Sequence, residues 1–131
     1  MKKLFLLAAL AGLGFVSCKK NHYGSYLKGT YKGTFKRYNE PGAEEANVSI
    51  NFNSPNWSGT SDIDKYPALA QGRFSSDGEV IRFTNTAAWT ADFDWTLILD
   101  GTYIERAEGD SLVFTKSYGN GWVDVYKLKK Q

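Results

Sequence analysis

Residues 26–37 read Tyr-Leu-Lys-Gly-Thr-Tyr-Lys-Gly-Thr-Phe-Lys-Arg, a stretch with a strict repeat of two residues. Apolar side chains or glycine occupy the odd-numbered positions 27–35, and lysine or threonine occupies the even-numbered positions 28–36. This alternation predicts a long β-strand with one face toward a core and the other toward solvent. Glycine at the inner positions 29 and 33 predicts a sharp bend or the close approach of another strand.

The same period continues to the C-terminus. Further strands are expected at residues 46–52, 57–62, 68–74, 80–85, 95–99, 102–107, 111–116 and 122–130. Short turns separate most of them, among them Asp77-Gly78 and Asp100-Gly101, which are typical of hairpins. No segment after residue 26 has the 3.6-residue period and the caps of a helix. The chain therefore predicts an all-β domain of about eight or nine strands.

Strands that follow one another through short turns pair antiparallel. About eight of them can close into a barrel or divide into two packed sheets. Closure is favoured, because a single meander lacks the long connections that a Greek key needs. The predicted fold is an antiparallel up-and-down β-barrel in which strand 26–37 pairs with strand 122–130, so that no sheet edge remains.

Length and charge narrow the possible partners. The chain has 131 residues and a formal net charge of +2, and its first 20 residues contain lysines but no acidic residue. The rest of the chain is one domain in length and close to neutral. This balance argues against nucleic acid as a partner, because phosphate binding needs a clustered basic surface. The C-terminal lysines Lys127, Lys129 and Lys130 are interpreted as a solvated strand end.

The N-terminus has the pattern of an export signal. Lys2 and Lys3 precede an apolar run over residues 4–16, which ends in Ser17-Cys18. The run is too short to cross a bilayer comfortably. An ordinary signal peptide with a chance cysteine and a transmembrane anchor are the alternatives to a lipidated cysteine. Cys18 is the only cysteine of the chain, so it belongs to no disulfide framework and another use of its thiol is favoured.

Phe15-Val16-Ser17-Cys18 resembles the lipobox of bacterial lipoproteins. The resemblance implies a signal peptide at residues 1–17, a lipidated tether at residues 18–25, and acyl chains such as palmitate on Cys18 that anchor the protein to a membrane. Surface-exported lipoproteins of Bacteroidota often have acidic residues after this cysteine, whereas Lys19-Lys20-Asn21-His22 follow it here. The expected location is the bacterial cell envelope, at the outer membrane and facing the periplasm.

A second resemblance concerns the barrel. Leu27-Lys28-Gly29-Thr30-Tyr31 resembles the Gly-x-aromatic start of lipocalin-like barrels, and Tyr126-Lys127-Leu128 stands in the last strand. Together with the signal, the chain resembles the small lipocalin-like lipoproteins of Bacteroidota. The resemblance implies a lipocalin-like or calycin-like barrel over residues 26–131 and non-covalent binding of a small, partly apolar ligand.

Many aromatic residues fall on the inner face of the predicted strands. These are Tyr31, Phe35, Phe52, Phe74, Phe83, Trp95, Tyr103, Phe114 and Tyr126. An eight-stranded barrel is just wide enough to be filled by its side chains or to hold one small ligand. So many large rings predict a largely filled interior, and a ligand pocket that is shallow and close to one mouth of the barrel.

The longest expected loop contains the densest polar and aromatic cluster. Residues 89–95 combine the indoles of Trp89 and Trp95 with the carboxylates of Asp92 and Asp94. Aromatic faces beside carboxylates suit a sugar or a cationic ligand. The alternative is a loop that folds its own rings over the barrel end, with the two aspartates as solvated turn residues.

The predicted function is binding of a small apolar or sugar-like molecule at the barrel mouth. In this hypothesis Trp57, Trp89 and Trp95 form the contact surface, Tyr31 and Tyr103 are polar handles, and Asp92 or Asp94 adds selectivity. The rival is a filled barrel that contacts another protein of the cell envelope. A dry cavity at the mouth favours the first hypothesis, and an exposed apolar patch on a packed barrel favours the second.

The sequence contains little that indicates catalysis. Asp92 and Asp94 have a spacing that glycosidase carboxylates use, but nothing ensures the deep cleft and raised pKa of an acid catalyst. His22, the only histidine, stands in the tether, and no cluster of metal ligands is visible. No phosphate-binding loop or nucleophile motif is present either. The expectation is a protein that is not an enzyme and needs no cofactor or metal.

Overall fold

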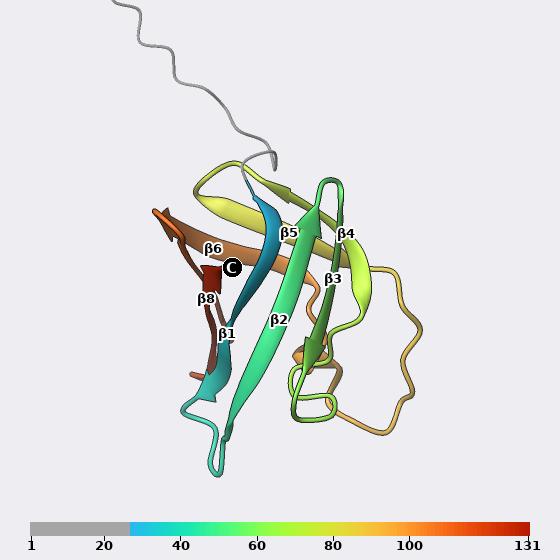
Figure 1. Cartoon of the computed structure of the whole chain (residues 1–131). Coiled ribbons are helices and arrows are strands. Elements are labelled where there is room, and N and C mark those ends of the chain that lie inside the picture. The colour runs from blue at the N-terminus through green and yellow to red at the C-terminus, as the bar shows by residue number, and fades with distance from the viewer. Residues whose placement is uncertain (1–26) are drawn as a thin grey trace, which may run out of the picture.

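A computed structural model describes residues 27–131, which form one closed antiparallel barrel of eight strands (Figure 1). Each strand pairs with its neighbours in sequence, and the last strand pairs with the first. The strands are β1 Lys28–Tyr38, β2 Glu45–Asn53, β3 Asn56–Ser61, β4 Gln71–Ser76, β5 Val80–Asn85, β6 Gly101–Glu108, β7 Ser111–Ser117 and β8 Val123–Lys130. The predicted all-β, up-and-down barrel is confirmed. The expected signal peptide and Cys18 lie outside the described residues.

Closure depends on the long pairing of β1 with β8, which runs from Tyr31 opposite Lys130 to Tyr38 opposite Val123. The two backbones approach closely at Gly33. A Cβ atom at this position would lie 1.8 Å from the backbone oxygen of Lys127, so only glycine fits. The prediction that an inner glycine of this strand permits the close approach of another strand is confirmed at position 33.

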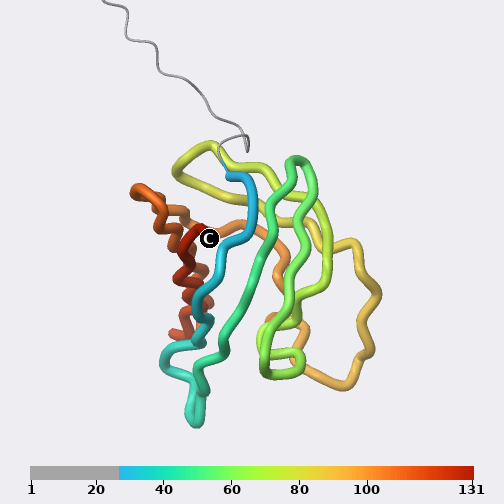
Figure 2. Tube along the Cα trace, viewed as in Figure 1, coloured from blue at the N-terminus to red at the C-terminus, as the bar shows by residue number. Residues whose placement is uncertain are grey.

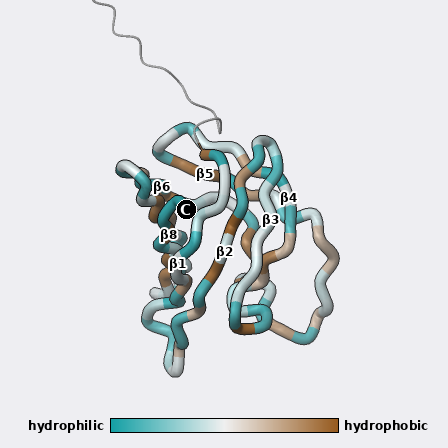
Figure 3. Tube along the Cα trace, in the orientation of Figure 1, coloured by the Kyte–Doolittle hydropathy of each residue, from teal (hydrophilic) through white to brown (hydrophobic). Residues whose placement is uncertain are grey.

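Aromatic side chains fill the barrel. Phe83 lies near the middle, with its ring centroid 5.1 Å from that of Phe114, 5.7 Å from Tyr103 and 5.8 Å from Trp57. Buried and exposed residues alternate along strands such as β2, β4 and β8, and the colour of β2 changes between brown and teal in Figure 3. The interior is therefore a packed core, which matches the filled barrel expected from the number of large rings.

Residues 95–99 differ from the prediction. They form no strand: Trp95–Leu97 is a short 3-10 helix, so the barrel has eight strands and not nine. Asp94 caps this helix through a hydrogen bond from the Thr96 N–H to its carboxylate, which favours a turn over extended backbone. The prediction that Trp95 points into the barrel is also wrong, because its side chain is 55% exposed.

The predicted strand 68–74 begins later than expected, at Gln71. Ala68 instead forms an isolated parallel bridge with Ile98, which lies just beyond the 3-10 helix. This bridge joins the connection between β3 and β4 to the connection between β5 and β6. Because the strands alternate in direction, both connections lie at the same end of the barrel, together with the β1–β2 and β7–β8 turns. We call this the loop end.

Candidate ligand site at the loop end

Residues 86–100 form the longest connection between the described strands, and part of it stands away from the barrel wall (Figure 2). Its second half is fastened to the β3–β4 connection. The Ala68 N–H donates to the Leu97 carbonyl at 2.9 Å, and the Leu99 N–H donates to the Ala68 carbonyl at 3.2 Å. Leu99 is fully buried. The loop therefore has a hydrogen-bonded and apolar base on the barrel.

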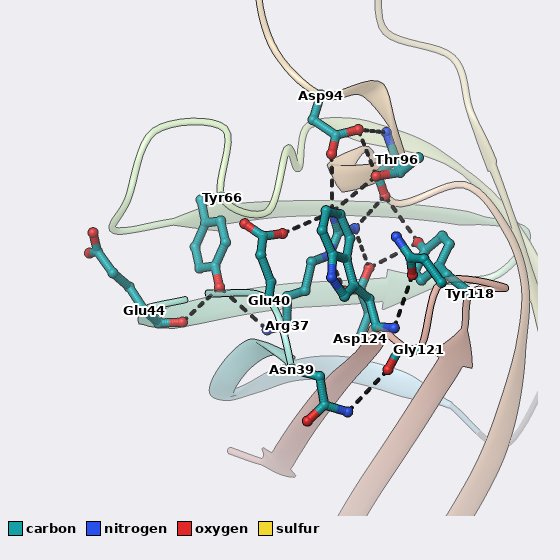
Figure 4. A network of polar contacts seen from close by, with 12 residues as sticks. Arg37, Asn39, Glu40, Glu44, Tyr66, Asp94, Thr96, Tyr118, Gly121 and Asp124 are labelled. Carbon is teal, nitrogen blue, oxygen red and sulfur yellow. Dashed lines mark hydrogen bonds and ion pairs between the residues drawn. The ribbon is translucent and has the colours of Figure 1, made fainter. Parts of the chain in front are cut away.

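A buried arginine also holds this loop (Figure 4). Arg37 lies near the end of β1 with its side chain fully buried, directly opposite Asp124 of β8. Its Nε donates to Asp124 Oδ1 at 2.6 Å and its Nη2 donates to Asp124 Oδ2 at 2.8 Å. Two parallel bonds of this kind are the strongest arrangement that a guanidinium and a carboxylate form.

The other side of the Arg37 guanidinium contacts the loop. Nη1 donates to Asp94 Oδ2 at 3.2 Å and to Thr96 Oγ1 at 3.0 Å, and Nη2 donates to the Thr96 carbonyl at 3.2 Å. The rings of Tyr118 and Trp122 lie 5.0 and 5.2 Å from the guanidinium carbon. We call Arg37, Asp94, Thr96, Tyr118 and Asp124 the Arg37 cluster. It joins β1, β8 and the loop at one point.

Charges within the Arg37 cluster oppose the effect of burial. Burial would lower the pKa of Arg37, but the hydrogen bond and the charge of Asp124 outweigh it, so the pKa is raised above its ordinary value. The pKa of Tyr118 is also raised, first by burial and then by the negative charge of Asp124. The arginine is therefore permanently charged and the phenol remains protonated, which preserves its 2.9 Å hydrogen bond to Asp124.

A second contact fastens the first half of the loop. Lys65, in the β3–β4 connection, donates to Thr90 Oγ1 at 3.2 Å and to Asp92 Oδ1 at 3.4 Å. Its ammonium group also lies 5.2 Å from the centre of the Phe93 ring, which packs edge-on against Trp89. The first half of the loop thus contacts the β3–β4 connection through exposed groups, and two of its rings pack against each other.

The loop carries an open hollow of about 430 Å³. Its lining consists of Asn85, Ala87, Ala88, Trp89, Trp95, Ile98 and Asp100. Both indole N–H groups are used within the protein: Trp89 donates to Asn85 Oδ1 at 3.1 Å, and Trp95 donates to the Thr90 carbonyl at 2.7 Å. The hollow therefore combines two oriented indoles with one carboxylate, which suits a small molecule with an apolar face and hydroxyl groups.

The predicted site residues do not all meet in this hollow. Trp89 and Trp95 line it, whereas Trp57, Tyr31 and Tyr103 are buried in the barrel core with exposed fractions of 2%, 5% and 1%. Trp57 is notable because its indole N–H is buried and has no hydrogen-bond acceptor among the described residues. None of these three side chains lines the hollow of the loop pair; Trp57 and Tyr31 each border a different hollow, and all three pack in the core.

The two aspartates of the loop have other partners. Asp94 belongs to the Arg37 cluster, and Asp92 is exposed beside Thr90 and Lys65. The pKa of Asp92 is lowered, chiefly by the hydrogen bond from Thr90. Burial raises the pKa of Asp94, but hydrogen bonds from Thr96 and the charge of Arg37 reverse this and leave it lowered. A lowered pKa is the opposite of what an acid catalyst at neutral pH requires.

Two further features concern the described residues alone. Within residues 27–131, no three side chains of His, Cys, Asp or Glu gather as a metal would require. The same part of the chain has no helix with the length and apolar character to cross a bilayer.

Sequence reasoning missed Arg37 and Asp124, which hold the loop. Both positions continue the inner faces of their strands, two residues after Phe35 and two residues before Tyr126. Once the first strand is paired with the last, this places two opposite charges inward and across from each other. No protein-family model, curated protein or solved structure matches this chain, so the geometry of the loop end carries the functional proposal.

Proposed function

We propose that this chain is a lipid-anchored, non-enzymatic protein of the bacterial cell envelope that binds a small, partly apolar, sugar-like molecule at its loop end. The pattern of residues 1–20, with Cys18 as the only cysteine, supports the anchor. The observation that carries the binding proposal is the pair of indoles in one hollow. The Trp95 side chain remains 55% exposed although its N–H group donates to the Thr90 carbonyl. The apolar surface of this indole therefore has a fixed orientation and is accessible to a ligand.

The packed interior determines where such a ligand binds. Phe52, Phe83 and Phe114 have exposed fractions of 2% or less and lie in one aromatic cluster. The ligand therefore binds on the outside of the barrel, between the loop and the β5–β6 wall. One face of a sugar ring stacks on an indole in this arrangement, and a hydroxyl group donates to the carboxylate of Asp100.

Native mass spectrometry of the protein, exported by its own signal and gently purified, tests the binding site. The wild-type protein is expected to show an added mass that disappears on denaturation and gives the chemical class of the ligand. Trp95→Ala is expected to lose this mass, because about half of the aromatic surface of the hollow is removed. Ile104→Ala is the matched control, since Ile104 is 59% exposed on β6, outside the hollow. Retention of the mass in Trp95→Ala, or its absence from the wild type, would contradict the proposal.

Membrane fractionation tests the anchor separately. Cys18→Ser changes a single atom of the side chain and removes the only thiol that acyl chains can modify. The variant is expected to move from the detergent-extracted membrane fraction to the soluble fraction, because the acyl chains supply the membrane affinity. Ser25→Ala, in the same tether, is expected to stay with the membrane. If Cys18→Ser still requires detergent for extraction, the lipoprotein proposal is wrong.

An interaction module is the second candidate, and both the packed interior and an apolar row on the outer wall favour it. Val80, Ile104 and Val125 lie in one row across β5, β6 and β8, with Thr115 of β7 between the last two. Ile104 is among the most exposed large apolar side chains of the described residues. A protein, and not a small molecule, as the added mass in the same native spectrum would support this function.

A further inference from the structure

Five lysines share the outer face of β1 and β8, two strands that lie side by side (Figure 1). They are Lys28, Lys32 and Lys36 of β1 and Lys127 and Lys129 of β8, and we call them the lysine face. Lys32 lies directly opposite Lys129, and Lys127 lies opposite Thr34. All are exposed except Lys36, which is half-buried. Residues 39–122 separate the two strands and contain no such cluster, so closure of the barrel creates this face.

The lysine face is not neutralised by ion pairs in the folded protein, although Glu45 of β2 lies directly opposite Lys36 at its edge. None of its five ammonium groups forms an ion pair with a carboxylate of residues 27–131. The same residues contain 12 basic and 14 acidic side chains, a net charge of −2, so the face is not a result of general basicity. Like charges directly opposite each other destabilise a strand pair. Lys32 and Lys129 therefore oppose folding, and an anion outside the barrel would relieve that repulsion.

The position of the lysine face indicates which anion this is. Lys28 is the first residue of β1 and follows Leu27, where residues 1–26 join the barrel. Eight residues lie between Cys18 and Leu27, and the nine Cα–Cα steps from one to the other extend to about 30 Å at most. A chain anchored at Cys18 thus keeps the lysine face close to the membrane surface. This raises the effective concentration of headgroups around it.

The choice of lysine over arginine also favours an anionic bilayer as the partner of this face. The face contains lysine alone and no arginine, and lysine acts as a hydrated point charge that suits the diffuse field of an anionic bilayer. Arginine, the usual residue for bidentate recognition of nucleic-acid phosphates, occupies the outer faces of β4, β5 and β6 instead, at Arg73, Arg82 and Arg106. The outer face of β1 and β8 carries a single aromatic ring, that of Tyr38 beside Lys36, and one ring is no platform on which successive bases stack.

We propose that the lysine face binds the headgroups of anionic phospholipids and orients the barrel with β1 and β8 against the membrane. The inference rests on the proposed anchor for the identity of the membrane, but the contact itself requires no acyl chain. In this orientation the 86–100 connection, which carries the loop hollow, stands on the side of the barrel opposite β1 and β8 and away from the lipid (Figure 1).

Vesicle co-sedimentation tests the contact without the anchor. The protein used is residues 18–131 with Cys18→Ser, which contains the whole closed barrel and carries no lipid. It is expected to bind vesicles of phosphatidylcholine mixed with phosphatidylglycerol and to dissociate from them at high salt. It is not expected to bind vesicles of phosphatidylcholine alone. Reversal of Lys32, Lys127 and Lys129 to glutamate is expected to weaken binding by about 100-fold or more, since each lysine contributes about 5-fold.

The matched control reverses the same number of charges elsewhere. Arg73→Glu, Arg82→Glu and Arg106→Glu, combined in one variant, change three exposed residues on the opposite wall and are expected to leave vesicle binding nearly unchanged. Circular dichroism verifies that both triple variants keep their β structure. Equal losses in the two variants, no binding of the parent chain to the anionic vesicles, or a preference for a DNA duplex over those vesicles would each overturn the proposal.

Because this protein carries no lipid, its result is independent of the fractionation of Cys18→Ser. Binding to anionic vesicles by a chain whose cysteine proves unmodified would leave the lysine face in place and remove the anchor. If the lipid-free variant fails to bind anionic vesicles but Cys18 of the exported protein proves to be lipidated, the anchor stays and the lysine face is no lipid-binding surface.

Discussion

Asp124→Asn is expected to lower the free energy of unfolding by about 3–5 kcal/mol. The substitution preserves the shape of the side chain but removes the negative charge opposite Arg37. The guanidinium then remains fully buried and loses its only buried carboxylate partner. It keeps its contacts with Thr96 and with two more exposed carboxylates, Asp94 at 3.2 Å and Glu40 at 3.6 Å. A buried charge without its partner costs far more than a surface ion pair contributes.

Urea denaturation of wild type and variants measures this loss. Asp92→Asn is the matched control: it makes the same chemical change in the loop that the Arg37 cluster holds, but its ion pair with Lys65 is 3.4 Å long and exposed. Its denaturation midpoint is expected to stay near that of the wild type, because exposed ion pairs contribute little. Arg37→Met combined with Asp124→Leu is expected to recover part of the loss, since both charges are then absent. Equal midpoints for Asp124→Asn and Asp92→Asn would contradict this account of the Arg37 cluster.

The sequence predicts the barrel well because the signals that specify its strands and turns are local. A period of two along residues 26–37 and turn signals such as Asp77-Gly78 each depend on a few neighbouring residues. The predicted strands agree with the observed ones within a few residues over most of the wall, and the expected pairing of the first strand with the last is confirmed. Closure itself follows from the number of antiparallel strands and the need to remove sheet edges.

The sequence predicts the loop less well, because local and tertiary preferences compete there. Residues 95–99 read Trp-Thr-Leu-Ile-Leu, a composition typical of a strand. The structure instead satisfies Thr96 with the side chain of Asp94, and it joins Ile98 to Ala68, 30 residues earlier in the chain. The preference of these residues for an extended backbone is weaker than the combined effect of the Asp94 cap and the buried contact of Ile98.

The buried Arg37–Asp124 ion pair and the lysine face could not be predicted for a different reason: both depend on the register between β1 and β8. Arg37 and Asp124 are 87 residues apart in sequence, and Lys32 and Lys129 are 97 apart by number, yet each pair lies directly opposite across β1 and β8. A shift of one residue would move every one of these side chains to the other face of the wall. The register between these two strands therefore decides that the ion pair lies inside the barrel and the lysines lie outside it.

Glu105→Gln is expected to stabilise the protein at about pH 8 and to change its stability little at about pH 5. Glu105 points into the opposite end of the barrel from the Arg37 cluster and is only 4% exposed. Ser76 donates a hydrogen bond to its Oε1 atom, whereas Oε2 is buried without a partner among the described residues. Burial raises the pKa of this carboxyl from 4.5 to about 7.

The sign of the effect follows from the two states of the carboxyl. Below about pH 4.5 it is protonated in both the folded and the unfolded chain, and it adds no pH dependence. Between that pH and about 7 the unfolded chain loses the proton while the folded chain keeps it, so stability falls as the pH rises. Above about pH 7 the folded protein holds a buried charge, and the full cost is on the order of 3 kcal/mol.

Urea denaturation at about pH 5 and about pH 8 separates this cost from the titration of other groups. Glutamine keeps an acceptor for Ser76 and removes the ionisable group, so the difference in unfolding free energy between Glu105→Gln and wild type is expected to grow with pH. Glu108→Gln, on the same strand but exposed, is expected to follow the wild type at both pH values. A constant difference between Glu105→Gln and wild type would mean that this carboxyl is ionised in the folded barrel at both pH values. The β4–β5 hairpin, which supplies Ser76, would then have to be opened to water to hydrate it.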